Sequence, residues 1–535
     1  MSTPSAWPEL MDSPPPPERP APTYWLTRFV LLRLLGVVYA VAFLVAANQN
    51  GPLIGEHGLL PVGSYLDQVR NALGSTATAF FQLPSIFWFA HSDTALLVAA
   101  WIGFALACIV AAGFANALLL TVLWLLYMSF VHVGQDDWYG YGWEFQLLET
   151  GFLAIFLCPL LDARPFPQRA PPLQIIWLFR WLIFRIMLGA GLIKIRGDAS
   201  WRNLTALYYH FETQPIPNPL SRWFHFLPRI VLRCGTFFTH VAELGAPWFV
   251  FWPRLARHIA GGVIIGFQCV LILSGNLSFL NWLTIVPALA CFDDSFWSRV
   301  LPRALVRRAE QAAQSAQPSR LHENTAWVVV AIVALLSLQP VANMLSPSQV
   351  MNASFDPLDL VNTYGAFGYV GKERDNIIFE GTDADVPDDH AVWKPYPYKG
   401  LPVDLYRRPP QIAPYQLRLD WRMWFASMGT PAQYPWTLHL VWKLLHNDPG
   451  TLSLFASNPF PGKPPRYIRA AYYKYSFAPP GNPDGRWWNR QFLGLWLPPL
   501  STDNPEFRRA LADYGWIPPD APAPAASAPA TAPSP

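Results

Sequence analysis

The sequence predicts an α-helical polytopic membrane bundle of about nine spans, followed by a soluble α+β domain that is exported. Charged residues make up only 14% of the 535 residues, whereas soluble domains contain about 25%. Apolar runs close to about 20 residues, the length that crosses a bilayer as a helix, recur up to residue 345. After Ser346 the composition changes to Pro, Asp, Arg and Tyr with short strand-like runs. These observations indicate an anchored protein with a folded part outside the membrane.

The chain divides into four segments. Residues 1–24 form a proline-rich leader that we expect to be disordered, and it lacks the basic region and cleavage site of a signal peptide. The transmembrane helical domain covers 25–345 and the exported α+β domain covers 346–515. Residues 516–535 form a disordered Pro/Ala tail. Only the two middle segments are therefore expected to fold.

Each expected span is an apolar run long enough for a membrane helix, whereas a barrel strand alternates over only about 10 residues. Two of the runs depart most from an ordinary span. The run at 277–293 is short, and the run at 144–162 begins with Glu144 and Glu149. The expected spans lie near 26–47, 94–112, 114–133, 144–162, 173–194, 232–252, 257–275, 277–293 and 325–345.

Arginines in the short loops predict the orientation, because cytoplasmic loops retain Lys and Arg. With a cytoplasmic N-terminus, the arginine-bearing loops all fall on the cytoplasmic side: 162–172, 253–257 and 294–324. The opposite loops at 134–143 and 275–277 hold no Lys or Arg. The segment 195–231 is basic yet falls outside, and its Trp, Tyr and Pro content indicates a place in the membrane interface. The C-terminal domain is then exported.

Several runs in the exported domain have a recognisable secondary-structure pattern. "DNIIFEGT" and "RYIRAAYYKYSF" have the β-branched and aromatic content of strands. "WRMWFASM" and "TLHLVWKLLHND" have the spacing of helices. In "NTYGAFGYVGKERD" the glycines are expected to allow a bulged strand pair, with Lys372, Glu373 and Arg374 on its exposed side. The domain contains no cysteine, so its stability must come from packing.

Charged residues inside the expected spans form one candidate site, an intramembrane polar network. A charge at mid-bilayer costs at least about 2.5–3.5 kcal/mol, so it normally faces protein or a water-filled cavity. Two interpretations stay open: a buried ion-pair network that fixes the helix positions, or a polar cavity for a ligand or a client segment. The residues concerned are Arg28, Arg33, Glu144, Glu149, Arg180, Arg185 and Glu243.

"GLIKIRGDASWRNL" places Lys194 at the end of an expected span. A lysine at a helix end usually extends to the lipid headgroups. The alternative is a partly desolvated amine with a lowered pKa, which acts as a base or binds an acidic partner. Asp198 and Glu212 lie in the same exit segment and could keep the amine charged, which would oppose catalysis.

Other kinds of site lack their sequence patterns. His132, His210 and His240 share no metal-ligand spacing, and the five cysteines form no C-x-x-C pair, so no metal site is expected. The glycine-spaced segment after residue 361 lacks G-x-G-x-x-G, and no cofactor is expected. A net charge of +3 without a basic stripe argues against a nucleic-acid partner. The absence of G-x-S-x-G indicates that the chain is not itself a lipase.

Long stretches of the chain resemble the lipase maturation factor family, and the resemblance covers nearly everything between about 24 and 500. The stretches are "LIGEHGLLP", "GWEFQLLETGFLAIFL", "GLIKIRGDASWRNLTALYYHFETQPIPNPLS", "LSGNLSFLNWLTI", "LVNTYGAFGYVGKER", "EGTD", "IAPYQLRLDWRMWFA" and "NPFPGKPPRYIRAAYYKY". The resemblance implies a membrane protein that helps secreted homodimeric lipases to fold, assemble and become active. Animal members reside in the endoplasmic reticulum.

No K-D-E-L type of retrieval signal ends this chain. We therefore expect a bacterial member in the inner membrane with its C-terminal domain exported. In a eukaryote the corresponding place would be the endoplasmic reticulum membrane, with a lumenal C-terminal domain.

A second, local resemblance concerns "AGLIK" with the following Asp and Trp. This stretch is similar to a segment of the vitamin K-dependent γ-carboxylases and their bacterial membrane relatives. In those enzymes a lysine within A-G-x-x-K is the catalytic base, and Lys194 falls at that position. The match covers about one helix and its exit loop, so it implies shared ancestry more than shared chemistry.

We expect a non-enzymatic maturation factor whose partners are the lipid bilayer and an unfolded or assembling secreted lipase or hydrolase. Arg466, Arg469, Tyr472 and Tyr473 are the expected client-binding residues, because Arg and Tyr are common in binding hot spots. The alternative is an intramembrane enzyme of γ-carboxylase ancestry that uses Lys194 as its base.

Overall fold

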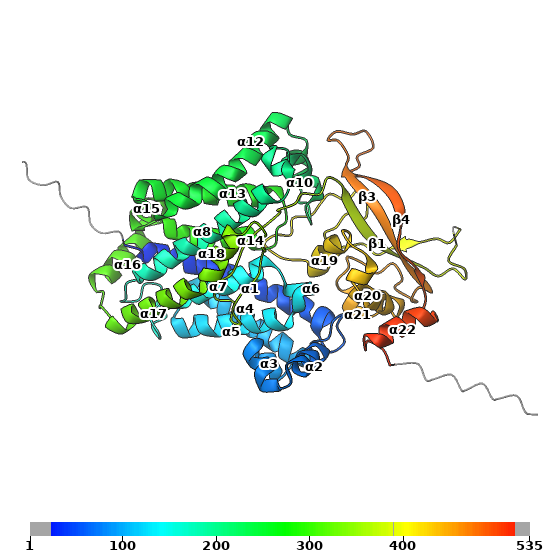
Figure 1. Ribbon diagram of the computed structural model, residues 1–535, viewed down its shortest axis with the longest axis horizontal. Coiled ribbons are helices and arrows are strands. Elements are labelled where there is room, and N and C mark those ends of the chain that lie inside the picture. The colour runs from blue at the N-terminus through cyan, green and yellow to red at the C-terminus, as the bar shows by residue number, and fades with distance from the viewer. Residues whose placement is uncertain (1–22, 389, 519–535) are drawn as a thin grey trace, which may run out of the picture.

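The computed structural model describes residues 23–388 and 390–518 and has two halves (Figure 1). Helices fill the N-terminal half, and a four-stranded sheet with its own helices forms the C-terminal half. The expected leader lies outside the described residues except for Thr23 and Tyr24, and so does the tail beyond residue 518. A continuous cluster of buried apolar side chains extends from one half into the other.

Five helices in the described ranges are long and apolar enough to cross a membrane. They are α1 (Trp25–Ile54), α4 (Asp93–Ala112), α8 (Leu173–Arg196), α13 (Arg254–Ser274) and the continuous stretch of α17 (Arg320–Leu336) and α18 (Leu338–Leu345). The shorter apolar helices are α5 (Ala117–Val133) and a stretch formed by α14 (Leu280–Ala288) and η4 (Leu289–Cys291). The membrane-type helical architecture is confirmed, whereas the expected count of about nine spans is not.

The expected spans at 144–162 and 232–252 are not long α-helices. The first is α7 (Gly142–Ile155), which has only 14 residues and is buried by protein almost throughout. The second is divided among α12 (Arg229–His240), the π-helical turn η2 (Val241–Gly245) and the 3₁₀ stretch η3 (Ala246–Phe251). An apolar run therefore predicts burial in these places but neither the length nor the type of helix.

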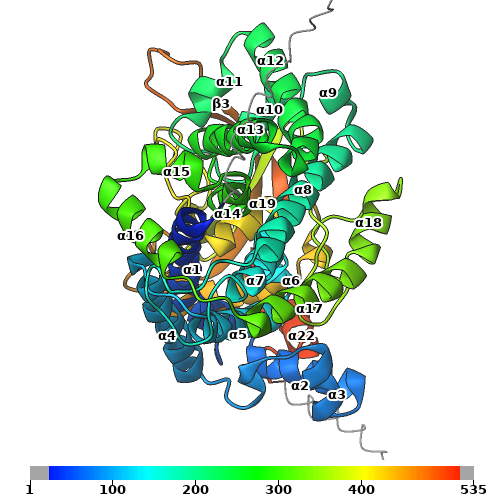
Figure 2. The same ribbon diagram turned by 90° about the vertical axis from the view of Figure 1, so that its left-hand side faces the viewer.

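Two close helix contacts organise the bundle. α8 is its central helix: 78% of its most apolar window is buried, and it contacts α7, α14, α17 and η3 (Figure 2). α1 packs along α4, where a Cβ at Gly36 would lie 2.5 Å from the Ala111 backbone nitrogen. Only glycine permits this approach of the two helices.

Short helices connect the longer ones. They are α2 (Val62–Leu73), α3 (Thr76–Gln82), η1 (Ile86–Trp88), α6 (Gln135–Tyr139), α9 (Ala199–Arg202), α10 (Leu207–Thr213), α11 (Ser221–His225), α15 (Asp294–Val300) and α16 (Arg303–Gln314). Of these, α9 to α11 form the segment expected at the membrane interface, and Arg222 on α11 donates to the Pro479 carbonyl of the C-terminal half.

The C-terminal half is an α+β unit with an antiparallel sheet in the order β2-β1-β3-β4. The strands are β1 (Arg374–Thr382), β2 (Lys394–Pro395), β3 (Tyr467–Phe477) and β4 (Trp488–Leu500). The helices are α19 (Arg418–Ala426), η5 (Pro431–Gln433), α20 (Trp436–Leu445), α21 (Pro449–Leu452) and α22 (Pro505–Asp513). The predicted strands are β1 and β3, and the predicted helices are α19 and α20.

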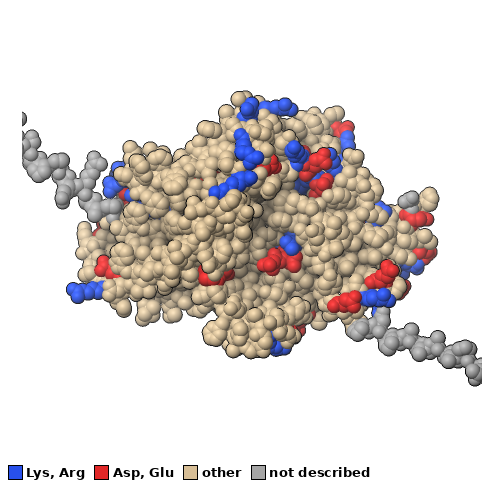
Figure 3. All heavy atoms as spheres, viewed as in Figure 1, with Lys and Arg blue, Asp and Glu red and all other residues tan. Residues whose placement is uncertain are grey.

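The two ends of the bundle differ in what covers them. Loops that carry the arginines lie together at one end, where the Asp294 backbone N–H donates to Thr23 and the Gln317 N–H donates to Gln168. The other end meets the C-terminal half, where the Asn276 side chain accepts the Ile412 N–H at 2.8 Å. In Figure 3, charged side chains are sparse over the bundle between its outer end and this junction.

Candidate functional site

The intramembrane charged residues do not form one network. Three arginines near the end with the arginine-rich loops bind backbone carbonyls: Arg28 donates to Arg169 at 2.8 Å, Arg180 donates to Ala290 at 3.0 Å, and Arg33 donates to Phe29 at 2.8 Å. Arg180 also donates to the Tyr24 hydroxyl at 2.7 Å. The three arginines therefore donate to carbonyl and hydroxyl oxygens and not to a carboxylate, and the buried Nη2 of Arg28 has no partner among the described residues. The three glutamates have other partners.

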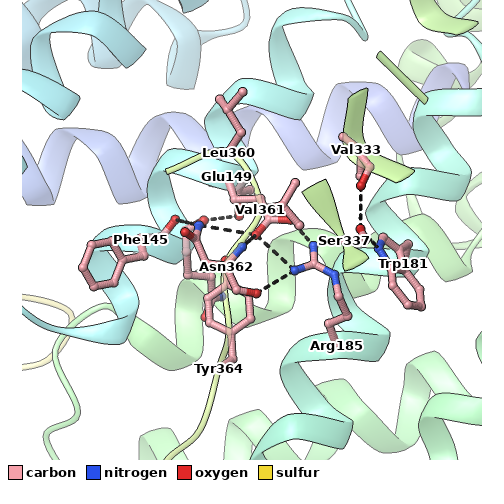
Figure 4. Close-up of polar contacts among 12 residues, drawn as sticks. Phe145, Glu149, Trp181, Arg185, Val333, Ser337, Leu360, Val361, Asn362 and Tyr364 are labelled. Carbon is pink, nitrogen blue, oxygen red and sulfur yellow. Dashed lines mark hydrogen bonds and ion pairs between the residues drawn. The ribbon is translucent and has the colours of Figure 1, made fainter. Parts of the chain in front are cut away.

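Glu149 on α7 and Arg185 on α8 form a buried ion pair at the junction of the two halves (Figure 4). Tyr364 donates its hydroxyl to Glu149 at 2.7 Å, and the backbone N–H of Asn362 donates to the same carboxylate at 3.1 Å. Arg185 in turn donates to the Asn362 carbonyl at 2.8 Å. A segment that follows the bundle in sequence therefore completes an ion pair inside it.

Glu144, five residues earlier on α7, binds a residue of the C-terminal half. Arg418 on α19 donates to its carboxylate at 2.9 Å, and both side chains are fully buried. Tyr127 and Trp143 also donate to Glu144. Sequence reasoning missed Arg418, because a partner 274 residues away leaves no local signal.

Gly189 on α8 and Gly197, which directly follows the helix, allow the segment 362–370 to approach the bundle. A Cβ at Gly189 would lie 2.5 Å from the Tyr364 carbonyl oxygen, and one at Gly197 would lie 2.4 Å from the Gly368 oxygen. The segment does not form the expected bulged strand pair, and strand β1 begins only at Arg374. Arg374 was expected on an exposed side, which is wrong: it is buried and donates to the Pro215 carbonyl at 2.9 Å.

Lys194 and Glu243 form the third buried pair. The Lys194 ammonium donates to both carboxylate oxygens of Glu243, at 2.7 and 2.8 Å, and lies 5.3 Å from the centre of the Trp201 ring. Lys194 is 4% exposed, so it does not extend to a headgroup layer. Glu243 lies in the π-helical turn η2, a type of turn that is frequent at functional sites.

The acidic partner of Lys194 is not one of the two residues expected from its exit segment. Asp198 instead caps α9 by accepting the Ser200 N–H at 2.8 Å. Glu212 accepts the Phe477 N–H of strand β3 at 2.6 Å, and burial raises the pKa of its carboxyl above the ordinary value. Both carboxylates therefore position the C-terminal half or the exit segment.

Lys194 and Glu243 line a cavity of about 590 Å³, here called the central cavity. Its walls include residues of α7, α8, α10, α12, η2, α13, α14, the segment 364–369 and α19. Apolar side chains dominate the walls, including Met187, Phe267 and Phe425. This volume lies within the range of about 300–1,000 Å³ that is typical of small-molecule sites.

A second polar group lines the central cavity deeper in the bundle. Gln146 donates to Thr284 at 3.1 Å, and Asn281 donates to Gln268 at 2.7 Å. Gln268 contacts Met187 on α8, which precedes Lys194 by seven residues, or about 10 Å along the helix. The cavity therefore has two polar patches separated by an apolar stretch of wall.

His210 on α10 also lines the central cavity and is buried. Burial, with a smaller contribution from the charge of Lys194, lowers its pKa from 6.5 to about 4. His210 is therefore a neutral imidazole at physiological pH. His132 forms a hydrogen bond with Asp359, and His240 forms one with the Trp201 carbonyl. No cluster of three or more metal-ligating side chains occurs within residues 23–388 and 390–518.

Three of the expected client-binding residues lie on β3 and are engaged within the C-terminal half, and Arg466 directly precedes the strand. Arg469 pairs with Glu380 at 2.8 Å, Tyr473 donates to Glu380 at 3.0 Å, and Tyr472 donates to the Ser427 carbonyl at 2.8 Å. Arg466, which pairs with Asp385, is the one of the four that is exposed. β3 is a central strand, so its side chains pack against both neighbours.

β4 is the edge strand of the sheet and carries three of the exposed apolar side chains of this half. Phe492, Leu493 and Leu495 are 54%, 46% and 45% exposed. Only β3 pairs with β4 among the strands that the structure describes, so the outer row of β4 backbone groups faces outward. The sequence "NRQFLGLW" does not predict this edge strand, because Gly494 and the register shifts interrupt the alternation of apolar and polar residues.

The family model described as the lipase maturation factor transmembrane domain matches residues 26–299, and the lipase maturation factor C-terminal domain matches residues 360–498. Lipase maturation factor 1 from Bos taurus is 48% identical over 507 residues, which cover 90% of both chains. The Homo sapiens protein of the same name is 46% identical over 540 residues, 94% of both chains. Lipase maturation factor 2 from Rattus norvegicus is 28% identical over 610 residues, 91% of this chain and 84% of the relative. No solved structure matches significantly.

The two matched domains correspond to the two halves of the fold. The first contains the central cavity and its Lys194–Glu243 pair, and the second contains Arg418 and the exposed strand β4. The membrane-type helices agree with the description of the first domain. Identities of 48% and 46% over 90% and 94% of the chain show the family. The chain belongs to the lipase maturation factor family and is a membrane maturation factor.

Proposed function

We propose that the chain assists the folding and assembly of secreted lipases or related exported hydrolases. In this proposal the membrane bundle (25–345) is the anchor and the α+β region (346–515) binds the client. The names of the relatives support lipases as clients. The position of the C-terminal half supports these two roles, because this half lies at the end of the bundle opposite the arginine-rich loops.

The orientation follows from the same arrangement. An odd number of crossings places the two ends of a chain on opposite sides, and this holds for the five long helices and for about nine spans alike. A cytoplasmic N-terminus then exports the C-terminal half, into the periplasm from a bacterial inner membrane or into the lumen from the endoplasmic reticulum. The eukaryotic relatives support the second setting.

The observation that carries the client-binding proposal is the exposed edge of β4. An incompletely folded hydrolase presents extended backbone and apolar side chains. A free strand edge can pair with that backbone, while side chains such as Leu493 and Leu495 bury apolar surface. In this scheme Arg469, Tyr472 and Tyr473 hold β3 in place beside β4, and Arg466 lies just before the start of β3.

Site-specific crosslinking and paired substitutions test this edge. A photoreactive residue at Leu493 is expected to capture a secreted hydrolase that has not reached its native, protease-resistant form. Leu493→Lys with Leu495→Lys is expected to weaken client binding about tenfold. The specific activity of the secreted hydrolase, measured per milligram of its protein and with its transcript unchanged, is then expected to fall toward the level of a gene deletion.

The matched control replaces two other exposed apolar residues of the same half. Val386 and Val392 are 61% and 70% exposed in the loop between β1 and β2. Lysines at these positions are expected to leave hydrolase activity unchanged. Equal losses from both pairs, or capture only of native hydrolase at Leu493, would contradict a client-binding role for β4.

The enzymatic alternative requires Lys194 to act as a free base. Its Nζ instead makes two hydrogen bonds to the Glu243 carboxylate and is engaged in a buried ion pair. The geometry therefore supports a binding and folding role for the chain better than a catalytic one.

A further inference from the structure

We propose that the central cavity binds one molecule of an uncharged amphipathic lipid whose polar end carries hydroxyl or carbonyl groups, of the monoacylglycerol type. The proposal goes beyond the maturation role and concerns a site within the bundle. It rests on four features: the shape of the cavity mouth, the apolar walls, the neutral charge balance, and hydrogen-bond donors without acceptors.

The mouth of the central cavity is apolar. Val231 and Phe238 on α12 and Val270 on α13 line the cavity and are 46%, 37% and 41% exposed. Partly exposed apolar residues therefore belong to the wall on α12 and α13, and α13 is one of the candidate spans. Tyr369 and Met428 of the C-terminal half also line the cavity and are 76% and 62% exposed. A cavity wall exposed through Val and Phe side chains beside a candidate span admits an acyl chain from the bilayer more readily than a water-soluble ligand.

Charges facing the central cavity cancel. Its charged lining residues are Lys194, Glu243 and Arg422, within the described part of the chain. Lys194 is paired with Glu243, and Arg422 is paired with Asp137. His210, which also faces the cavity, is neutral at physiological pH because its pKa is about 4. An anionic lipid would have to displace Glu243 from Lys194, whereas an uncharged polar head adds to the existing pair.

The polar patches present donors that the protein does not use fully. A lysine ammonium has three N–H donors, and two of those of Lys194 reach Glu243. The Gln268 amide nitrogen contacts only the Met187 sulfur, at 3.7 Å, which is a weak acceptor. Tyr141 lines the cavity, and its buried hydroxyl has no partner in the described residues. Hydroxyl and ester oxygens are the acceptors that would satisfy such donors.

The arrangement of these groups fits a single acyl chain. Two patches about 10 Å apart, joined by apolar wall, suit a ligand whose oxygens bind at one patch while its chain runs past the other. Glycerol bearing one acyl chain supplies two hydroxyls and an ester carbonyl without any charge. A free fatty acid has the same chain with a carboxylate, and so provides the matched negative comparison.

The test uses the full chain reconstituted in phosphatidylcholine nanodiscs. The probe is 1-oleoylglycerol that carries a photoreactive diazirine in its acyl chain, and labelled peptides are identified by mass spectrometry. We expect labelling in α8, α13 and α14 that unlabelled 1-oleoylglycerol suppresses and oleate does not. Equal competition by oleate would overturn the uncharged-head assignment, and labelling spread evenly over the lipid-facing helices would overturn the site.

Two variants reduce the cavity volume. Ala190→Phe adds a ring to the wall on α8, and Gly235→Leu adds a side chain whose Cβ meets only the flexible Leu207 side chain. Each is expected to lower cavity labelling about tenfold, which corresponds to about 1.4 kcal/mol of binding free energy. Ala105→Phe, at an exposed position on α4, is the matched control and is expected to leave labelling unchanged. Unchanged labelling in both folded cavity variants would contradict the proposal.

A charge variant tests the headgroup separately. Glu243→Gln leaves the Lys194 ammonium without its carboxylate, so a carboxylate ligand can replace it. We expect oleate to compete with the probe at least about tenfold better in this variant than in the native chain. Failure of oleate to gain affinity in a folded Glu243→Gln protein would show that Lys194 does not contact the polar head. A variant that loses hydrolase maturation but keeps its lipid labelling would be defective in client binding at β4 and not in lipid binding.

Discussion

Glu144, Glu149 and Glu243 each have a cation of their own. Arg418 binds Glu144, Arg185 binds Glu149, and Lys194 binds Glu243. Removing one member of such a pair leaves a buried charge without compensation, which costs more than the intact pair contributes. At the scale of the residue, the bundle and the C-terminal half therefore fold correctly only when all three ion pairs form.

We expect Arg185→Leu to reduce the yield of folded protein. The change strands Glu149 among Asn362 and Tyr364, with a cost of about 3–5 kcal/mol for an unpaired buried charge. The measurement is the monodisperse fraction in size-exclusion chromatography, together with thermal unfolding in detergent.

Arg33→Leu is the control for the loss of an arginine in a span. Arg33 donates to the carbonyls of Phe29 and Gly113 and contacts no carboxylate among the described residues, so its loss strands no charge. Its effect is expected to be clearly smaller. Equal losses in both variants would indicate that the guanidinium matters for packing and not for pairing.

Asp420 on α19 makes stability depend on pH. Its Oδ1 accepts the N–H groups of Gly400 and Leu401, and its Oδ2 is buried without a partner in the described residues. Burial raises the pKa of this carboxyl from 3.8 to about 6. The folded protein therefore keeps a proton that the unfolded chain loses, and the resulting stabilisation, about 3 kcal/mol below pH 4, disappears as the pH rises through about 6.

Asp420→Asn is expected to raise the thermal midpoint at pH 7.5, because the amide resembles the protonated acid. At pH 4 the native chain and the variant are expected to unfold at similar temperatures. Tryptophan fluorescence during heating, recorded at both pH values, gives the comparison. A difference that is the same at pH 4 and pH 7.5 would contradict the role assigned to the buried carboxyl.

At the scale of the element, hydropathy predicted the long helices well. The expected spans at 26–47, 94–112 and 173–194 coincide with α1, α4 and α8. It failed for 144–162 and 232–252, because an apolar run is buried equally well by lipid or by protein and carries no information on π or 3₁₀ turns. The partners of the buried glutamates could be listed only within the spans, so Arg418 was missed.

The position of a strand within the sheet could not be predicted from the sequence either. Tyr473 and Phe492 have similar local patterns, yet Tyr473 is buried on a central strand and Phe492 is exposed on the edge. Strand order depends on pairing between distant segments, which local periodicity does not encode. Local patterns therefore did not predict that exposed apolar side chains of the sheet lie on β4.

Gly189→Val is expected to destabilise the packing between α8 and the segment 362–370. A Cβ there would lie 2.5 Å from the Tyr364 carbonyl oxygen, and overpacking of this kind costs about 1–3 kcal/mol. Gly262→Val on α13 is the matched control, since nothing lies within 4 Å of its Cβ. Thermal unfolding of both variants is compared, and a midpoint for Gly189→Val at or above that of the control would contradict the close approach.

For the whole molecule, sidedness is the first property to test. Cysteines are introduced at Ser315, after α16, and at Ser457, on the surface of the C-terminal half, in a background without the five native cysteines. Since the arginine-rich end is expected to face the cytoplasm, an impermeant thiol reagent should label Ser457→Cys on intact bacterial cells and Ser315→Cys only after lysis. Labelling of Ser315→Cys on intact cells would reverse the orientation.

The ion pair between Glu144 and Arg418 also constrains the order of biosynthesis. Glu144 enters the membrane while Arg418, 274 residues later, has yet to be translated. During synthesis, Glu144 in the bundle therefore has no Arg418 to pair with until the other half of the chain is made. A premature stop codon between these positions removes a component of the bundle itself, so the truncated product lacks a complete anchor and not merely its exported region.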